Sequence, residues 1–275
     1  MRGSPWPSRA CGCSAISPPT VAELWARLEP HIAVFGPDDD LPRPAVLLFH
    51  GCGGVRGHMA DYAAAAAALG VRAFVIDSFA HRGWSYAFGA TFVCTGLRFW
   101  GRERAGDVLA ALWGVTRRAD VDPTRICLAG WSHGGWTLMD LMTMPLQRPG
   151  EAALADPDPA LLGGVRSLFL AYPYGGLGAL SRSHDWRRAP EVLGLVPSWD
   201  HFTGPGDVRR IYEPARRAGA SVELWEMEAG THSFDEPEPH FPMRAHPEMT
   251  AQARLRFGAF LQRTLETAQP AMQSR

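Results

Sequence analysis

Short, continuously apolar runs alternate with helical patterns along most of this 275-residue chain, and this alternation limits the folds open to it. Such runs are typical of strands buried on both faces of a parallel sheet. They predict strands over residues 45–49, 72–76, 125–129, 165–171, 191–196 and 221–228. Helices are predicted over residues 21–28, 60–69, 103–117, 135–144, 207–218 and 247–267. The alternation implies an α/β fold, with right-handed crossovers and a mostly parallel sheet covered by helices on both faces.

Length and charge indicate how many domains the chain has and which classes of partner it can bind. The chain suits one domain, which we place at residues 20–275, and residues 1–19, rich in Pro, Ser and Gly, are predicted to be a flexible arm. The formal net charge is -1 with both signs scattered, which argues against a nucleic-acid or membrane partner. The apolar run Ala63–Leu69 is far shorter than the ~20 residues of a membrane span. The N-terminus lacks the apolar stretch of a secretory signal, so we expect a cytoplasmic protein.

The five cysteines are too few and too spread for a disulfide scaffold, which favours free thiols: Cys11, Cys13, Cys52, Cys94 and Cys127. Cys11 and Cys13 lack the second pair of ligands that a zinc knuckle needs. The prolines among the late histidines, at positions 237, 239 and 242, argue against the regular spacing of a metal site, so no metal is expected. Cys52 and Cys94 each fall in a loop after a predicted strand. We therefore expect these two to approach each other near the sheet edge, either paired or free.

The strongest motif is Gly130-Trp131-Ser132-His133-Gly134-Gly135, which lies between a buried strand and a helical pattern. A strand-to-helix turn this tight strains its central residue, and glycines two before and two after it remove side chains that would clash. Ser132 is thus predicted to stand above the sheet edge as a nucleophile. The backbone N–H of His133 lies at a helix N-terminus, where it can stabilise an oxyanion.

A second glycine-rich turn, His50-Gly51-Cys52-Gly53-Gly54, ends the strand 45–49. Its glycines let the backbone approach a substrate carbonyl, which makes the N–H of Cys52 the candidate second oxyanion donor, with Gly51 or Gly53 as alternatives. We expect His50 to be a buried residue hydrogen-bonded to backbone. The Cys52 thiol does not lie in the tight strand-to-helix turn that would expose a nucleophile, so we do not expect it to attack the substrate.

The general base should lie on a loop after the last strand, and His232 in Gly230-Thr231-His232-Ser233-Phe234 has that place. His240 and His246 compete, but they lie in a Pro-rich acidic segment. The acid that orients the base should follow the preceding strand. Asp200 does so, directly after Pro197-Ser198-Trp199.

Two other aspartates compete with Asp200 for this role. Asp207 is the main alternative, although helix capping is its simpler function, and Asp185 fits poorly because it precedes the strand. Three irregular stretches are candidates for a lid over the sheet edge: residues 79–101, 145–164 and 173–189.

With these residues in place, the chain resembles the dienelactone hydrolase family from about Pro44 to Leu261. The resemblance is carried by the two glycine-rich motifs and by four further segments: Asp77-Ser78-Phe79 with Arg82-Gly83, Val121-Asp122-Pro123 with Arg125-Ile126, Asp200 to Thr203, and Thr231 to Asp235. It implies an α/β-hydrolase fold, a triad of Ser132, Asp200 and His232, and backbone oxyanion donors at Cys52 and His133. Enzymes that open dienelactones have a cysteine where this chain has Ser132, so the resemblance is to a serine variant.

These observations predict a serine hydrolase that needs no cofactor or metal and cleaves a small carboxylic ester, lactone or thioester. Transfer of the acyl group to another alcohol, or cleavage of an amide, would use the same side chains. A binding module without catalysis is the alternative from another class, because one fold hosts unrelated functions. The intact Ser, His and Asp candidates favour the enzyme.

Overall fold

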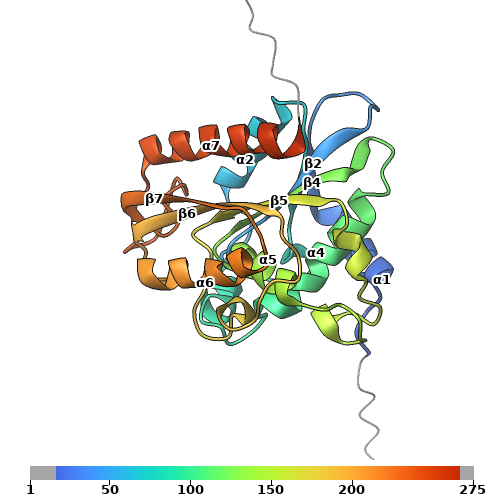
Figure 1. Ribbon diagram of the computed structural model, residues 1–275, viewed down its shortest axis with the longest axis horizontal. Helices are drawn as coiled ribbons and strands as arrows, with labels where there is room; N and C mark the ends of the chain where they lie inside the picture. The colour runs from blue at the N-terminus through green and yellow to red at the C-terminus, as the bar shows by residue number, and fades with distance from the viewer. Residues whose placement is uncertain (1–16, 267–275) are drawn as a thin grey trace, which may run out of the picture.

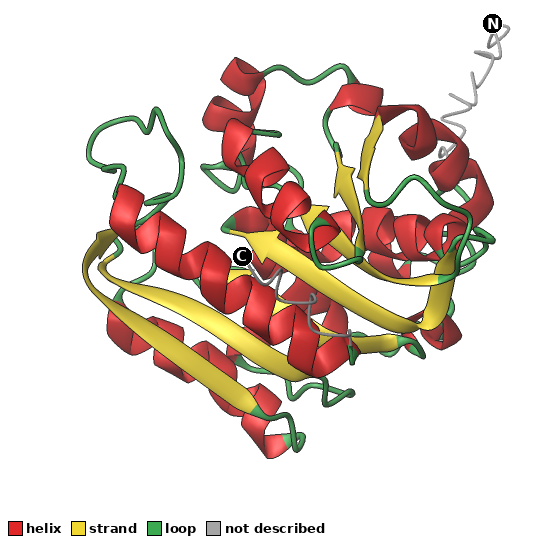
Figure 2. Cartoon of the chain, turned by 90° about the horizontal axis from the view of Figure 1, so that it is seen from above, coloured by secondary structure: helices red, strands yellow, loops and turns green. Residues whose placement is uncertain are grey.

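A seven-stranded sheet forms the centre of the protein, a computed structural model of which describes residues 17–266. The strands are β1 (Ile32–Phe35), β2 (Arg43–Phe49), β3 (Arg72–Ile76), β4 (Val121–Trp131), β5 (Val165–Ala171), β6 (Glu191–Trp199) and β7 (Val222–Thr231). Their spatial order is β1-β3-β2-β4-β5-β6-β7; β1 is antiparallel to β3, and all other pairs are parallel. Figure 2 shows the twisted sheet between its helices. The predicted α/β fold is confirmed.

Helices cover both faces of the sheet. They are α1 (Val21–Leu28), α2 (Gly57–Ala67), the single turn α3 (Tyr86–Phe88), α4 (Gly101–Val115), α5 (His133–Thr143), α6 (Pro205–Arg217) and α7 (Pro247–Leu265). In Figure 1, α2 and α7 lie above the sheet, whereas α1, α4, α5 and α6 lie below it. Each layer buries its own apolar cluster against the sheet, so the strands are buried on both sides, as their continuous hydrophobic runs require.

Short helical turns occupy the connections. A π-helix spans Gly89–Val93, and 3₁₀ turns span Glu29–His31, Ala80–Arg82, Glu151–Ala153, Pro159–Leu162 and Leu180–Arg182. All predicted strands and helices are present, and their ends differ from the predictions by at most four residues. The sequence did not predict β1 or the π-helix. β1 is a four-residue edge strand with partly exposed ends and an exposed middle, so its hydrophobic pattern is too short and too weak to stand out.

Of the three stretches considered as a lid, two border the cavity at the sheet edge. Residues 86–100 and 174–177 supply lining side chains, whereas none of the described lining residues comes from 145–164. The prediction for 145–164 is wrong because Leu154 and Leu162 bury themselves in the core beside α4. That stretch also holds the start of the described chain, since the N–H of Ala155 donates to the carbonyl of Pro19.

Residues 1–16 of the predicted arm lie outside the described part, so the arm and the single domain at 20–275 stay predictions. Within residues 17–266, no helix has both the length and the apolar character needed to span a bilayer.

Candidate active site

The turn from β4 into α5 holds Ser132 in a strained backbone conformation. Ser132 has φ 48° and ψ -110°, values that residues other than glycine rarely adopt. A Cβ at Gly130 would lie 2.7 Å from the carbonyl carbon of Gly134, and a Cβ at Gly134 would lie 2.1 Å from the carbonyl oxygen of Phe49. Only glycine fits at these two positions, and the tight turn leaves Ser132 at the carboxyl edge of the sheet, beside the end of β2.

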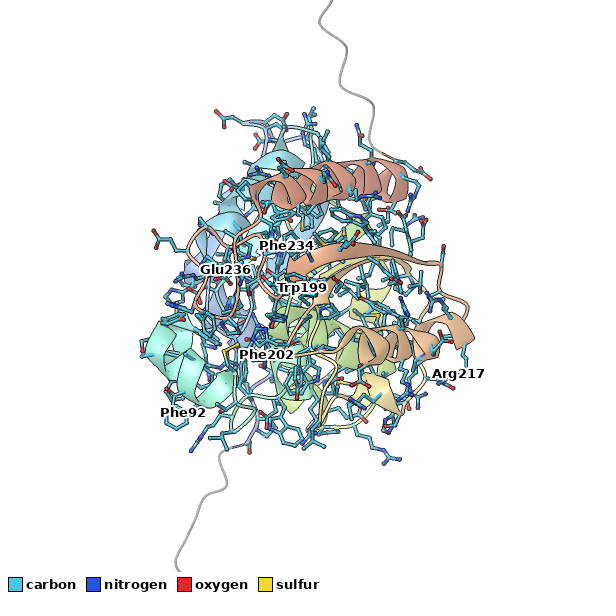
Figure 3. The ribbon with its side chains drawn as sticks, turned by 90° about the vertical axis from the view of Figure 1, so that its left-hand side faces the viewer. Phe92, Trp199, Phe202, Arg217, Phe234 and Glu236 are labelled. Atoms are coloured by element: carbon cyan, nitrogen blue, oxygen red, sulfur yellow. A yellow bond between two sulfur atoms is a disulfide. The ribbon has the colours of Figure 1, made fainter. Side chains whose placement is uncertain are left out.

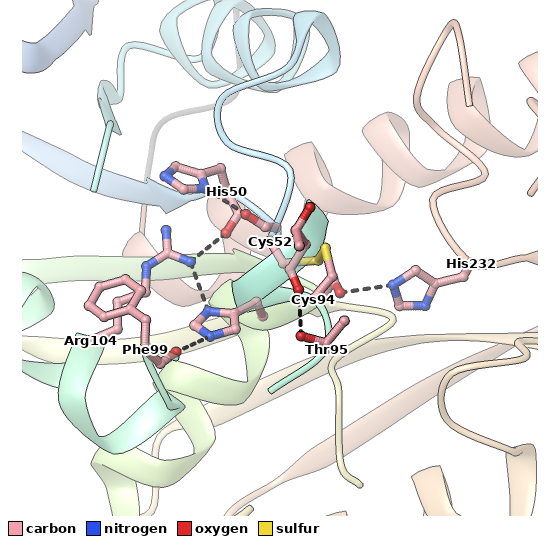
Figure 4. Close-up of a disulfide and its surroundings, with 11 residues drawn as sticks. His50, Cys52, Cys94, Thr95, Phe99, Arg104 and His232 are labelled. Atoms are coloured by element: carbon pink, nitrogen blue, oxygen red, sulfur yellow. Dashed lines mark hydrogen bonds between the residues drawn. A yellow bond between two sulfur atoms is a disulfide. The ribbon is translucent and has the colours of Figure 1, made fainter. Parts of the chain in front are cut away.

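Ser132, His232 and Asp200 are hydrogen-bonded in series. His232 Nε2 lies 2.8 Å from Ser132 Oγ, and His232 Nδ1 lies 2.8 Å from Asp200 Oδ2. The dashed line at His232 in Figure 4 marks the contact with the serine. A proton on Nδ1 that is donated to the carboxylate leaves the Nε2 lone pair to accept the serine hydroxyl. The structure thus brings together the three residues that the sequence proposed from three separate loops.

Asp200 is fixed in orientation by its own loop. It directly follows β6, and its Oδ1 accepts the backbone N–H groups of Phe202 at 2.8 Å and Thr203 at 3.0 Å. The carboxylate is buried, and its two oxygens have different partners. Oδ1 accepts the N–H groups of its own loop, and Oδ2 faces His232. This arrangement limits the carboxylate to one useful orientation.

Two aromatic rings enclose the imidazole of His232. The ring of Tyr172 lies 4.7 Å from that of His232, and the ring of Phe202 lies 4.8 Å from it. Figure 3 shows Phe202 beside Trp199, at the end of β6. Because the imidazole is buried between these rings, few orientations other than the one facing Ser132 are open to it.

The competing aspartates lie elsewhere. Asp207 was predicted to cap α6, and this is wrong: the helix begins two residues earlier, at Pro205, with Gly204 as its N-cap. Asp207 therefore lies inside the first turn, with its carboxylate 3.6 Å from the guanidinium of Arg182. Asp185 pairs with Arg217 on the surface.

The competing histidines are also placed apart from this chain of hydrogen bonds. His240 lines the cavity with its ring 5.3 Å from that of Tyr86, and His246 directly precedes α7. Neither takes the position of His232 between Ser132 and Asp200.

Two backbone N–H groups near Ser132 are free to bind an oxyanion. His133 is the first residue of α5, so its N–H has no acceptor within the helix. In the part of the chain that the structure describes, the N–H of Cys52 has no acceptor either. A Cβ at Gly51 would lie 3.5 Å from Ser132 Cβ, which shows how closely this loop approaches the serine.

Arg104, which was not predicted from the sequence, connects the turn that contains Cys52 to the side chain of His133. It is fully buried, and its Nη1 donates to the carbonyl of His50 at 2.7 Å and contacts Nδ1 of His133 at 3.2 Å. Nε donates to the hydroxyl of Ser78 at 3.1 Å. Burial lowers the pKa of Arg104 to about 9. The available signal was a pair of charged residues, Arg104 and Asp107, three apart on the otherwise apolar face of a helix.

The two histidines next to these loops are neutral and fixed as tautomers. His133 donates from Nε2 to the carbonyl of Phe99 at 2.6 Å, because Nδ1 must accept from Arg104. Burial and the charge of Arg104 lower the pKa of His133 to about 3. His50 donates from Nδ1 to the carbonyl of Gly51 and accepts the N–H of Ser78 on Nε2. His50 is buried and bonded to backbone, so that prediction is confirmed.

Asp235, for which no role was predicted from the sequence, holds the loop of His232 against the sheet. Its buried carboxylate accepts the indole N–H of Trp131 at 3.0 Å and the hydroxyl of Tyr172 at 2.5 Å. Trp131 ends β4 and Tyr172 follows β5, so one side chain fastens the loop of His232 to two neighbouring strands. An aspartate three residues after the candidate base was the only signal.

Cys52 and Cys94 form a disulfide, with their Cα atoms 5.1 Å apart. The expected approach of the two cysteines is confirmed, and the preference for free thiols is wrong for this pair. The preference failed because the two residues are 42 positions apart and no local pattern shows the contact. Bonded sulfurs carry no thiolate, which removes Cys52 as an attacking group. Cys127 is free and buried, and burial raises its pKa to about 12; Cys11 and Cys13 lie outside the described residues.

A cavity of about 250 Å³ opens at Ser132 and His232. Aromatic and small side chains dominate its wall. Among its described lining residues, Glu236 is the one carboxylate, and there is no lysine or arginine. Figure 3 shows Glu236 near Phe234. No group of three or more metal-ligating side chains occurs within residues 17–266.

No family model matches the chain, and no curated protein matches it. Solved structures do. A dienelactone hydrolase-type protein from Klebsiella pneumoniae is 16% identical, with a TM-score of 0.61, over 82% of this chain and 90% of that chain. An esterase from Thermogutta terrifontis with propionate bound is 18% identical, with a TM-score of 0.62, over 87% and 91%.

A third similar structure is a dienelactone hydrolase-like promiscuous phosphotriesterase from metagenomic libraries, which is 14% identical with a TM-score of 0.61. It is matched over 85% of this chain and 92% of that chain. The three agree over nearly their whole length, although few residues are identical. The chain therefore has the α/β-hydrolase fold, and its structural neighbours are dienelactone hydrolase-like proteins and esterases.

Proposed function

We propose that the chain is a serine hydrolase that cleaves a small, uncharged carboxylic ester through an acyl-enzyme on Ser132. The observation that carries the proposal is the continuous series of hydrogen bonds from Asp200 through His232 to the hydroxyl of Ser132. A serine hydroxyl is a weak nucleophile until a neighbouring base removes its proton, and this geometry supplies that base.

In the first half-reaction, Ser132 Oγ attacks the ester carbonyl carbon while His232 Nε2 takes the hydroxyl proton. Asp200 stabilises the imidazolium and keeps its Nδ1–H in place. The backbone N–H groups of Cys52 and His133 receive the oxyanion of the tetrahedral intermediate. When the intermediate collapses, the alcohol leaves with the proton from His232 and the acyl group stays on Ser132.

In the second half-reaction, water attacks the acyl carbonyl and His232 takes a proton from it. The carboxylic acid then leaves and Ser132 regains its proton, so the net reaction is ester plus water giving acid plus alcohol. Lactones and thioesters would follow the same steps. Transfer to another alcohol or cleavage of an amide uses the same groups, and no observation on this chain favours either over hydrolysis.

The wall of the cavity supports an uncharged substrate. No lysine or arginine among the described lining residues could pair with a carboxylate beside the scissile bond, and the one lining carboxylate, Glu236, already pairs with Arg56 at 3.6 Å. The volume of about 250 Å³ favours a short acyl or alcohol group, since pockets that bind drug-sized ligands measure about 300–1,000 Å³. The Thermogutta esterase was solved with propionate bound, and the small size of this carboxylate supports a short acyl group.

The test compares p-nitrophenyl acetate with p-nitrophenyl hydrogen succinate, which adds a carboxylate to a short acyl chain. We expect hydrolysis of the acetate, a kcat/KM about tenfold or more lower for the charged ester, and loss of both activities in Ser132→Ala. Ser183→Ala, in an exposed loop, is the matched control and should behave as wild type. A folded Ser132→Ala that still hydrolyses the acetate would refute the mechanism.

The cytoplasmic location stays a prediction. Disulfides persist mainly in oxidising compartments and are reduced by cytosolic thiols. In a cytoplasmic protein the Cys52–Cys94 bond would be open to reduction, so the compartment determines whether the cavity wall carries this covalent link.

A further inference from the structure

The Cys52–Cys94 disulfide joins the oxyanion loop, residues 50–54, to the wall segment of the cavity, residues 79–101. Cys52 lies three residues after the end of β2, and Cys94 is the C-cap of the π-helix Gly89–Val93. Both residues line the cavity that opens at Ser132. Figure 4 shows the yellow S–S bond among the oxyanion loop, the π-helical segment and His232. A covalent bond between these segments therefore lies within the site itself.

The backbone of Cys52 has few other restraints. Its N–H and its carbonyl have no hydrogen-bond partner within residues 17–266. The residues on either side are better held: Arg104 binds the carbonyl of His50, and Gly54 donates its N–H to the carbonyl of Gly51. At Cys52, one of the two positions whose N–H is proposed to bind the oxyanion, the disulfide supplies the restraint that hydrogen bonds do not.

The π-helix also packs directly on this peptide. A Cβ at Gly89 would lie 2.3 Å from the carbonyl oxygen of Cys52, so only glycine permits the approach. The N–H of Cys94 closes the π-turn on the carbonyl of Gly89 at 2.9 Å. The start of the π-helix thus touches the Cys52 peptide, while its end is bonded to the Cys52 side chain.

The wall segment has only a small apolar core of its own. Phe79, Val93 and Phe99 form a cluster apart from the two large cores, and Cys52 packs against it together with Trp84 and Phe88. A cluster of this size contributes little stability. Without the disulfide, only noncovalent contacts would hold the wall against the oxyanion loop, such as the packing of Phe79 on His50 and of Cys52 on the small cluster.

We propose that the Cys52–Cys94 disulfide is a positioning element of the oxyanion hole, which holds the N–H of Cys52 in place against the π-helical wall. Turnover then depends on the oxidised form. The inference rests on the proposed hydrolase function. Cys52 acts here through its backbone, so the role of the disulfide is to place a donor and not to react with the substrate.

Reduction by a dithiol such as dithiothreitol separates the two segments. A thiolate of the reagent attacks one sulfur and releases the other cysteine as a thiol. The second thiol of the reagent then closes a cyclic disulfide and releases the first cysteine. Two electrons and two protons pass from the reagent to the protein, which gains two thiols.

The experiment measures kcat and KM for p-nitrophenyl acetate on the full chain, oxidised and then reduced with dithiothreitol. The state of the tryptic peptides that contain Cys52 and Cys94 is checked by alkylation and mass. We expect kcat to fall about tenfold or more on reduction, with KM changed less than about threefold, and to recover on reoxidation. The loss of one complete oxyanion donor costs about 10²–10³ in kcat, and a displaced donor costs part of that.

Two variants serve as controls. Cys94→Ser removes the bond but leaves the Cys52 backbone intact, so we expect a low kcat that no longer responds to dithiothreitol. Cys127→Ala removes the buried free thiol and keeps the disulfide, so its response to reduction should equal that of wild type. Far-UV circular dichroism of each form, and of the reduced wild type, separates loss of positioning from unfolding.

An unchanged kcat in folded, fully reduced protein would overturn the proposal. A rise in KM at constant kcat would also overturn it, because the bond would then shape only the wall. Oxidised protein that neither hydrolyses esters nor reacts with a fluorophosphonate would instead refute the hydrolase function, and the positioning role with it.

Discussion

Replacing Asp200 with asparagine exchanges one carboxylate oxygen for an amide nitrogen, and the structure determines how the new side chain will sit. The present carboxylate accepts two backbone N–H groups on Oδ1, from Phe202 and Thr203, and faces His232 with Oδ2. An asparagine that turned its NH₂ toward the loop would set donors against donors. Leaving buried polar groups unpaired costs about 1–3 kcal/mol each, so the amide oxygen will stay on the loop side.

The NH₂ group then faces Nδ1 of His232. Because the amide can only donate there, Nδ1 must accept, and the imidazole proton moves to Nε2, which lies 2.8 Å from Ser132 Oγ. His232 can no longer take the serine proton. The same tautomer change lowers kcat about 10⁴-fold in serine proteases, which is about 5 kcal/mol of transition-state stabilisation.

The assay compares kcat for p-nitrophenyl acetate and the melting temperature of Asp200→Asn with those of wild type. Asp207→Asn is the matched control, since this carboxylate pairs with Arg182 on the surface and should leave the rate per folded molecule nearly unchanged. A folded Asp200→Asn that keeps more than about one tenth of the wild-type rate would refute the tautomer mechanism. An inactive Asp207→Asn beside an active Asp200→Asn would reverse the assignment of the acid.

Three further predictions concern the supporting residues. Burial raises the pKa of Asp140 to about 7 from 3.8, so the stability that this group contributes is present below about pH 4 and is lost as the pH rises toward 7. In urea unfolding, the free energy of unfolding of Asp140→Asn relative to wild type should therefore rise by up to roughly 4 kcal/mol over that range, and a constant difference would contradict this. The disulfide closes a loop across 42 positions, so its reduction should lower the free energy of unfolding by about 3–4 kcal/mol, and equal denaturation midpoints for both forms would show that the unfolded chain is not restrained. Arg104→Lys keeps the charge but cannot reach His50, Ser78 and His133 together, so kcat should fall about tenfold or more in folded protein; unchanged turnover would remove Arg104 from the support of the oxyanion hole.

Much of the fold could be predicted because its signals are local. Strands such as residues 165–171 are buried on both faces, and this leaves an unbroken apolar run in the sequence. The placement of Ser132 and Asp200 followed the same logic, since each lies three or four residues after the predicted end of a buried strand, at 129 and 196. The strands end two and three residues later than predicted, at Trp131 and Trp199, and both residues still lie at the edge of the sheet.

The features that were missed depend on contacts between distant segments. Arg104 and Asp235 act through side chains brought to them by folding, over separations of up to 104 positions, and nothing beside them in the sequence reveals those partners. The end of α6 nearest the site was misplaced because Pro205 begins the helix and Asp207 looks equally suitable as a cap. The disulfide forms across an irregular stretch whose path the hydrophobic pattern does not define.

The central claim is that Ser132 is an activated nucleophile, and its most direct test is labelling with a fluorophosphonate followed by peptide mapping. We expect one covalent adduct on Ser132 in wild type and a rate of labelling reduced by orders of magnitude in folded His232→Ala. Folded wild-type protein that stays unlabelled, or a label on another residue, would contradict the claim and favour a binding module built on the same fold.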